Sequence, residues 1–202
     1  TAITTTKSDG GVVIKWTAPT VGANQLPITD YEIRYGSSYA AGTPVAKTKS
    51  TVVVSDFFVA GTRTYWIVAR DTYGNESTPV SATFEIQNPG TPTAITTTKS
   101  DGGVVIKWTA PTVGANQLPI TDYEIRYGVD WATGTLVGIA KTTTITHSFF
   151  NASERFYFIK ARDIVGNETA TAGIESFTIQ NPATVTGATI MINEEDALLT
   201  FS

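Results

Sequence analysis

Few residues in this sequence have the types and spacing that catalysis requires. His147 is the only histidine, and it lies beside Ser148, so a Ser-His-Asp triad is the first chemistry to consider. The corresponding stretch of an internal repeat has Asp56 in place of Ser148 and no histidine. Because a triad needs a base that a third group orients in a pocket, a base present in one of two near-twin segments is not expected to be catalytic. We predict that His147 has a surface or strand-edge role.

Acidic residues also form small groups. Glu194 to Asp196 are consecutive, and adjacent carboxylates in a turn splay apart, whereas glycosidases need two carboxyl groups held across a cleft. Asp71 to Glu76 and Asp163 to Glu168 loosely resemble calcium loops but lack the ligand spacing of an EF-hand. A Gly-Asn turn explains both segments better. The sequence therefore predicts no catalytic residue, no metal site and no cofactor, and a protein that is not an enzyme.

Four aromatic residues are candidates for surface contacts, namely Tyr39, Trp66, Trp131 and Phe158. Trp66 and Phe158 occupy equivalent strand positions and are expected to face away from the apolar side of the strand. Tyr39 and Trp131 are equivalent positions in an expected loop. Exposed rings can stack on sugars or contact a partner chain, and they can equally cover the rim of a domain or pack against a neighbouring one.

The bulk composition limits the classes of function. Of the 202 residues, 41% are apolar and 10% aromatic, which is enough for a packed core. The net charge is −4 and there is no run of lysine and arginine, so nucleic-acid binding is not expected. Cysteine is absent, which excludes disulfides and thiolate metal sites. No apolar run is long enough for a membrane-spanning helix.

An internal repeat determines the expected domain organisation. Thr1 to Gly36 recur without change as Thr93 to Gly128, and the later halves diverge but stay aligned. The beginning of a third copy of the repeat follows Pro182. We therefore predict one module over residues 1–89, a second over 90–182, and the beginning of a truncated third over 183–202.

The short linkers between these modules contain proline, which limits bending. Since the two copies differ only after Gly36, we expect partner-specific contacts, where they exist, in the later strands and loops. The sequence does not begin with Met and stops in mid-pattern, so we interpret it as a segment of a longer protein.

Alternating apolar residues predict that each module is all-β. Val12, Ile14 and Trp16 share one face of a strand. Tyr31 and Ile33 share one face of another strand, and Glu32 between them takes the opposite face. Turn signals rich in glycine, asparagine and aspartate separate such runs. About seven short strands in each copy indicate a β-sandwich.

The run from Val12 to Pro19, followed by Ile28 to Gly36, resembles the fibronectin type III family. The later strand from Tyr65 to Asp71 fits the same pattern, and the likeness implies tandem immunoglobulin-like β-sandwiches. One departure concerns Arg63 and Arg155, which stand where the family usually has a tyrosine whose hydroxyl bonds nearby backbone. Either a neighbouring tyrosine substitutes, or the corner is absent and the arginine packs along the sandwich edge.

A narrower likeness concerns the segment from Asp130 to Gly134 and the later run from Ile159 to Glu168. These short segments look like parts of the modules found in bacteriophage tail-tip, tail-fibre and host-specificity proteins. The resemblance implies a structural spacer or adhesion role in a virion, homotrimers, contacts with other tail proteins, and weak contact with a host glycan or receptor. The alternative is an accessory spacer or carbohydrate-binding module of a secreted bacterial polysaccharide hydrolase.

Overall fold

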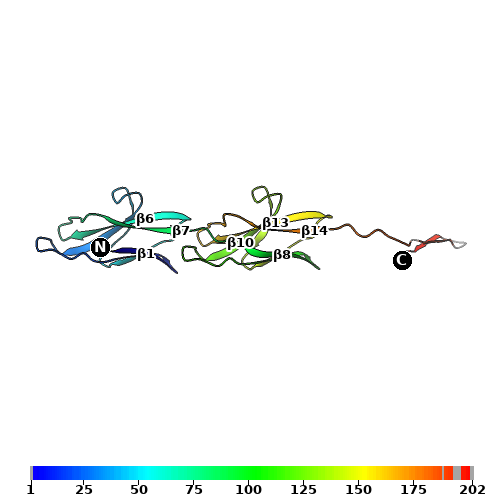
Figure 1. The fold of residues 1–202 in the computed structure, drawn as a ribbon, viewed down its shortest axis with the longest axis horizontal. Helices are drawn as coiled ribbons and strands as arrows, with labels where there is room; N and C mark the ends of the chain where they lie inside the picture. Colours follow the sequence, from blue (N-terminus) through cyan, green and yellow to red (C-terminus); the bar gives the residue numbers. More distant parts are fainter. Residues whose placement is uncertain (1, 188, 193–196, 201–202) are drawn as a thin grey trace.

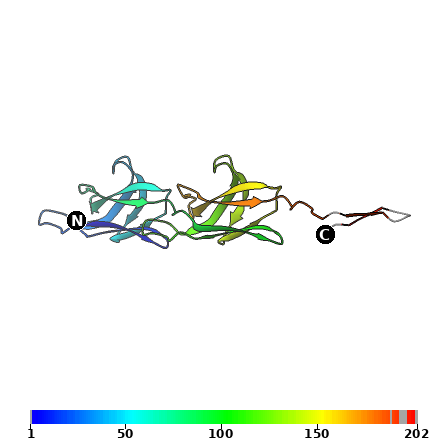
Figure 2. The same cartoon turned by 45° about the vertical axis from the view of Figure 1, so that its right-hand side comes forward.

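The computed structural model describes residues 2–187, 189–192 and 197–200. Two β-sandwiches lie end to end along the long axis of the molecule (Figure 1). A turned view shows the same arrangement (Figure 2). No helix capable of crossing a lipid bilayer occurs in the part of the chain that the structure describes. The predicted all-β fold class is confirmed.

In the first module, a three-stranded sheet of order β1-β2-β5 packs on a four-stranded sheet of order β4-β3-β6-β7, with every pairing antiparallel. The strands are β1 Ile3–Ser8, β2 Gly11–Trp16, β3 Ile28–Tyr35, β4 Thr43–Thr48, β5 Val52–Ser55, β6 Gly61–Asp71 and β7 Val80–Ile86.

The second module repeats this topology, with sheets of order β8-β9-β12 and β11-β10-β13-β14. Its strands are β8 Thr93–Ser100, β9 Gly103–Thr109, β10 Ile120–Gly128, β11 Thr135–Ala140, β12 Thr144–His147, β13 Ser153–Asp163 and β14 Gly173–Ile179.

Beyond the second module, a hairpin pairs β15 Thr189–Ile192 with β16 Ala197–Thr200. The acidic group from Glu194 to Asp196 lies outside the described residues.

The core of each module lies between its two sheets, where the predicted alternation places the large apolar side chains. Val12, Ile14 and Trp16 of β2 are buried, whereas Lys15 between them is exposed. Trp16 packs edge-on against Tyr31, with ring centroids 5.3 Å apart. The second module repeats this contact between Trp108 and Tyr123 at 5.2 Å. Edge-to-face aromatic pairs suit the ring quadrupoles and add to the gain from burial.

The two arginines at the family's tyrosine position stack on aromatic rings. The guanidinium of Arg63 lies 4.1 Å from the ring centre of Tyr35 and 4.0 Å from that of Phe58. Arg155 repeats this arrangement over Tyr127 and Phe150. Of the two possibilities left open by the sequence, the structure shows the arginine packed along the sandwich edge, held by cation–π contacts.

Candidate functional site

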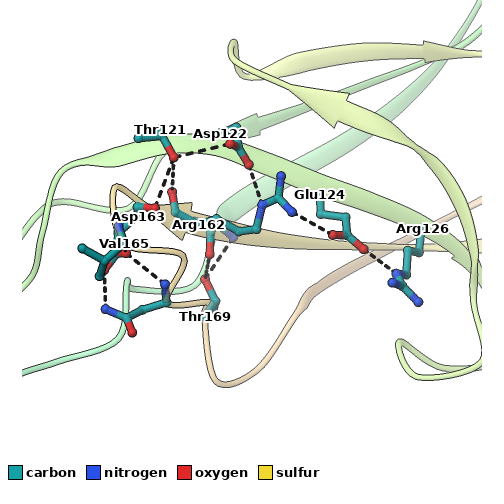
Figure 3. A network of polar contacts seen from close by, with 10 residues as sticks. Thr121, Asp122, Glu124, Arg126, Arg162, Asp163, Val165 and Thr169 are labelled. Atoms are coloured by element: carbon teal, nitrogen blue, oxygen red, sulfur yellow. Dashed lines mark hydrogen bonds and ion pairs between the residues drawn. The ribbon is translucent and has the colours of Figure 1, made fainter. Parts of the chain in front are cut away.

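The outer face of the four-stranded sheet carries the predicted aromatic positions and a row of charged residues. In the second module, Arg162 Nε donates to Asp122 Oδ1 at 2.6 Å and Arg162 Nη1 donates to Glu124 Oε2 at 3.2 Å. Arg126 Nε donates to the other oxygen of Glu124 at 2.6 Å (Figure 3). The buried Glu124 is therefore paired on both oxygens, as a buried carboxylate requires.

Trp131 and Tyr39 contact this charged row within their own modules. The ring centre of Trp131 lies 5.0 Å from the Arg126 guanidinium and 5.0 Å from the Lys160 ammonium. Tyr39 lies 4.8 Å from the Arg34 guanidinium, and burial raises the pKa of its hydroxyl. Both rings are half-buried. Their predicted contact with a sugar or partner stays a prediction.

The rings of Trp66 and Phe158, the two candidates on strands, are less exposed than the sequence predicts. Phe158 is only 6% exposed, so the prediction that its ring is available at the surface is wrong. It shares the outer face with Arg126, its cross-strand partner, and the loop bearing Trp131 folds back over this face. Trp66 is half-buried, and its Nε1–H donates to the carbonyl of Gly36 at 2.9 Å.

His147 lies at the end of β12 within a group of aromatic side chains. Its Nδ1 is 3.0 Å from the Tyr157 hydroxyl, and its ring lies 4.9 Å from that of Tyr127. Burial, and secondarily the positive charge of Arg155, lower the pKa of His147. In the first module the equivalent of Tyr157 is Tyr65, whose buried hydroxyl has no hydrogen-bond partner among the described residues.

The lowered pKa of His147 predicts a loss of stability in mild acid. The folded module disfavours the protonated ring, so below the ordinary imidazole pKa of about 6.5 the unfolded chain binds the proton more readily. Stability is therefore complete above that value and falls as the pH drops through the lowered folded-state pKa. We expect the melting temperature to decrease more between pH 7.5 and 5 in the native chain than in His147→Ser, which copies Ser55 of the first module. Equal decreases in the two proteins would contradict this assignment.

The turns that resembled calcium loops use their carboxylates internally. Asp71 accepts hydrogen bonds from the side chain of Asn75 and from the amides of Tyr73 and Asn75 at 2.8 to 3.0 Å. The bond from the Asn75 side chain is the main reason why the pKa of Asp71 lies below its ordinary value. No group of three or more acidic, histidine or cysteine side chains suited to a metal occurs among the described residues.

The second of these turns takes part in a junction between the modules. Each module has a loop end, which consists of one loop and one turn. In the first module these are the loop 22–26 and the turn 71–75, and in the second the loop 114–118 and the turn 163–167. The opposite ends of the sandwiches are the base ends. The loop end of the second module lies against the base end of the first, and hydrogen bonds join the two ends.

Backbone carbonyls of the loop 114–118 accept hydrogen bonds from the first module. Lys7 Nζ donates to the carbonyls of Gly114 at 3.1 Å and Gln117 at 2.6 Å. The amide of Gln87 donates to the carbonyl of Asn116 at 2.8 Å. Because charge-assisted and backbone bonds both constrain the loop, its position against the first module is well defined.

Two amide side chains of the second module complete this polar contact. Gln117 Nε2 donates to the carbonyl of Asn88 at 2.8 Å, and Asn167 Oδ1 accepts from the amide of Ala60 at 2.7 Å. Asn167 is itself held by Asp163, which accepts from its side chain at 2.8 Å and its amide at 2.9 Å. The buried Asp163 therefore orients the residue that contacts the first module.

An apolar contact lies at the centre of the junction. Leu118 is 0% exposed and belongs to the core cluster of the first module, which includes Phe58, Phe84 and Ile86. Val165 packs against the same cluster. The second module thus completes the core of the first, which couples their stabilities as well as their positions.

The linker is also fixed to the second module. The Thr169 hydroxyl donates to the carbonyl of Gly90 at 3.0 Å, and the Thr91 hydroxyl donates to that of Thr171 at 3.2 Å. Pro89 is buried. The limited bending expected from the proline-containing linker therefore has an additional cause, since the linker and both module ends are bonded together.

The junction is a contact within one chain, so the expectation that partner-specific contacts lie after Gly36 stays a prediction. The loop 114–118 lies within the stretch that is identical in the two modules. No motif marks this loop as a contact, and only the placement of the neighbouring module distinguishes it from the loop 22–26.

These features define two tandem modules with the fibronectin type III fold. No family model matches the chain. The chain is 29% identical over 184 residues to Exoglucanase B of Cellulomonas fimi, an alignment that covers 85% of this chain. The chain spans only 15% of the length of that protein.

The solved structures that are similar to this chain include two fibronectin type III arrays and a lytic enzyme. A two-domain fibronectin type III segment of chicken tenascin is 13% identical, with coverage of 88% of this chain and 98% of that one and a TM-score of 0.42. The central fibronectin type III array of RIM-binding protein is 15% identical, with coverage of 99% and 77% and a TM-score of 0.34. The spore cortex lytic enzyme SleM of Clostridium perfringens is 16% identical, with coverage of 52% and 34% and a TM-score of 0.41.

Proposed function

We propose that these modules form a stiff, non-catalytic spacer in a secreted enzyme that degrades a glucan, where they hold the catalytic part at a set distance from another part. The junction is the observation that carries this proposal. Leu118 and the hydrogen bonds from Lys7, Ala60 and Gln87 restrict the angle between the modules. A spacer that only joined two domains would not need a shared core, since flexible linkers also join domains.

The likeness to Exoglucanase B favours the second of the two functions expected from the sequence. The role in a bacteriophage tail remains a prediction from short sequence segments. None of the relatives reported above is a phage protein. Under the proposal the protein is secreted, and its partners are the domains joined to it in the same chain.

A chimera tests the spacer function. The chain would be placed between a glucanase catalytic domain and a cellulose-binding module, and activity would be measured on crystalline and on soluble substrate. We expect Leu118→Asp, which places a charge in the junction, to reduce activity on the crystalline substrate several-fold while leaving soluble-substrate activity unchanged.

The matched control is Leu26→Asp, the same change at the exposed twin position, which should leave both activities unchanged. Equal activities for the native and Leu118→Asp chimeras on crystalline substrate would refute a stiff spacer. Retention of the isolated chain by insoluble cellulose would instead support a carbohydrate-binding module.

A further inference from the structure

The outer face of the four-stranded sheet differs in character between the two modules. Four large apolar side chains on this face of the second module are each between 43% and 57% exposed. They are Leu136, Ile139, Phe156 and Ile174. The equivalent positions of the first module hold Pro44, Lys47, Thr64 and Ser81. All four positions follow Gly36 and Gly128, in the part of the repeat where the sequence predicts partner-specific contacts.

Strand pairing places the apolar residues in one stripe across the sheet. Arg126 of β10 lies opposite Leu136 of β11 on one side and Phe158 of β13 on the other. Ile174 of β14 is the next residue across, opposite Phe158. Cross-strand partners share a face and lie close enough to touch, so the stripe is continuous. The ring of Trp131 lies 5.0 Å from the Arg126 guanidinium, near the centre of the stripe.

A neighbouring module at either end does not cover this stripe. The second module has the first against its loop end, and the stripe remains exposed beside that contact. The first module has the second against its base end, and its residues Pro44, Lys47 and Ser81 remain exposed on the same face. The stripe is therefore a side surface of the tandem array, separate from the ends at which modules join.

The edge of the sheet beside the stripe has lost the residues that discourage pairing with another chain. Pro44 and Lys47 lie in the edge strand β4, and proline and lysine are residues that protect edge strands from other strands. The equivalent edge strand β11 has Leu136 and Ile139 in their place and contains no charged residue. This side of the second module is therefore open to contact where that of the first is protected.

The charges around the stripe are balanced within the module. Three cations pair with three carboxylates, and these are Arg126, Lys160 and Arg162 with Asp122, Glu124 and Glu168. A strongly charged partner would find no complementary charge on this face, which disfavours such a partner. An identical face, in contrast, is apolar and balanced in charge, and it can approach without repulsion.

We infer that the stripe is the contact surface for the same stripe of a second copy of this chain, in a two-fold dimer. A two-fold contact brings a patch onto itself, so apolar side chains meet apolar side chains. The stripe is about 14 Å long, since neighbouring strands lie about 4.8 Å apart. A patch of this size is smaller than the roughly 800 Å² per partner of a standard interface, so the dimer is weak and depends on concentration. The inference does not depend on the spacer function proposed above.

The first module supplies substitutions that the fold accepts at these positions. Sedimentation equilibrium of the full native chain is expected to show monomers and dimers and no larger species. The double variant Ile139→Lys, Ile174→Ser carries the residues of the first module at both positions. It should dimerise about tenfold more weakly or worse, because it removes apolar side chains and brings a lysine of each copy into the contact.

Val54→Thr is the matched control on the other sheet. Val54 is 51% exposed in the first module, and its counterpart in the second is Thr146. This variant removes an exposed apolar side chain outside the stripe, so it should dimerise like the native chain. A native chain that stays monomeric at millimolar concentration would overturn the inference, as would association without limit. Equal association of the native chain and the double variant, or an equal loss in Val54→Thr and the double variant, would also overturn it.

Discussion

Leu118→Ala is expected to weaken the coupling between the modules by about 2–3 kcal/mol, because it removes the apolar anchor of the junction. The exposed fraction of this leucine is 42% at the free twin position and 0% at the junction. At roughly 25 cal/mol per Å², burying that fraction of a leucine contributes about 2 kcal/mol, and the cavity left in the cluster around Phe58 and Phe84 adds to the loss. Chemical denaturation should show a lower free energy of unfolding, and small-angle scattering a broader distribution of lengths.

The internal repeat supplies the control for this prediction. Leu26→Ala makes the same change in an identical local sequence, at a position without a neighbouring module. Its effect on the free energy of unfolding should stay within about 0.5 kcal/mol, as for other surface substitutions. If both variants lost the same stability, the leucine would act within its own module, and the junction would not be the source of the coupling.

The fold could be predicted because each strand carries its own signal. Val12, Ile14 and Trp16 alternate with residues that tolerate solvent, and a period of two permits only one face toward the core. The turn at Asp71 was also predictable, because aspartate, glycine and asparagine have local preferences that do not depend on the rest of the molecule. Such signals are contained within a few residues.

The junction could not be predicted, because the information that creates it is not local. Leu26 and Leu118 have the same neighbours in sequence, and only the presence of another module decides which of them is buried. The error at Phe158 has a similar origin. Alternation correctly places its side chain on the outer face, but it does not reveal that a loop bearing Trp131 folds over that face.

Gly103→Ala is expected to cost about 2–5 kcal/mol, since it combines a steric clash with backbone strain. A Cβ atom at this position would lie 2.2 Å from the carbonyl oxygen of His147, and the glycine has a φ of +142°. The turn pairs β8 with β9, and β9 pairs with β12, so the clash would separate β9 from the end of β12. Thermal unfolding should show a melting temperature lowered by several degrees.

Gly102→Ala, one residue earlier, is expected to have the opposite sign. No atom lies within 4 Å of a Cβ at Gly102, and its φ is not positive, so alanine is accommodated while the unfolded chain loses conformational freedom. Such substitutions stabilise by about 0.4–1 kcal/mol. Gly10 and Gly11 repeat the contrast in the first module, where a Cβ on Gly11 would lie 2.3 Å from the carbonyl oxygen of Ser55. A similar loss at both glycines of the pair would mean that the turn needs flexibility, and that the close approach of β9 to β12 does not limit the choice of residue.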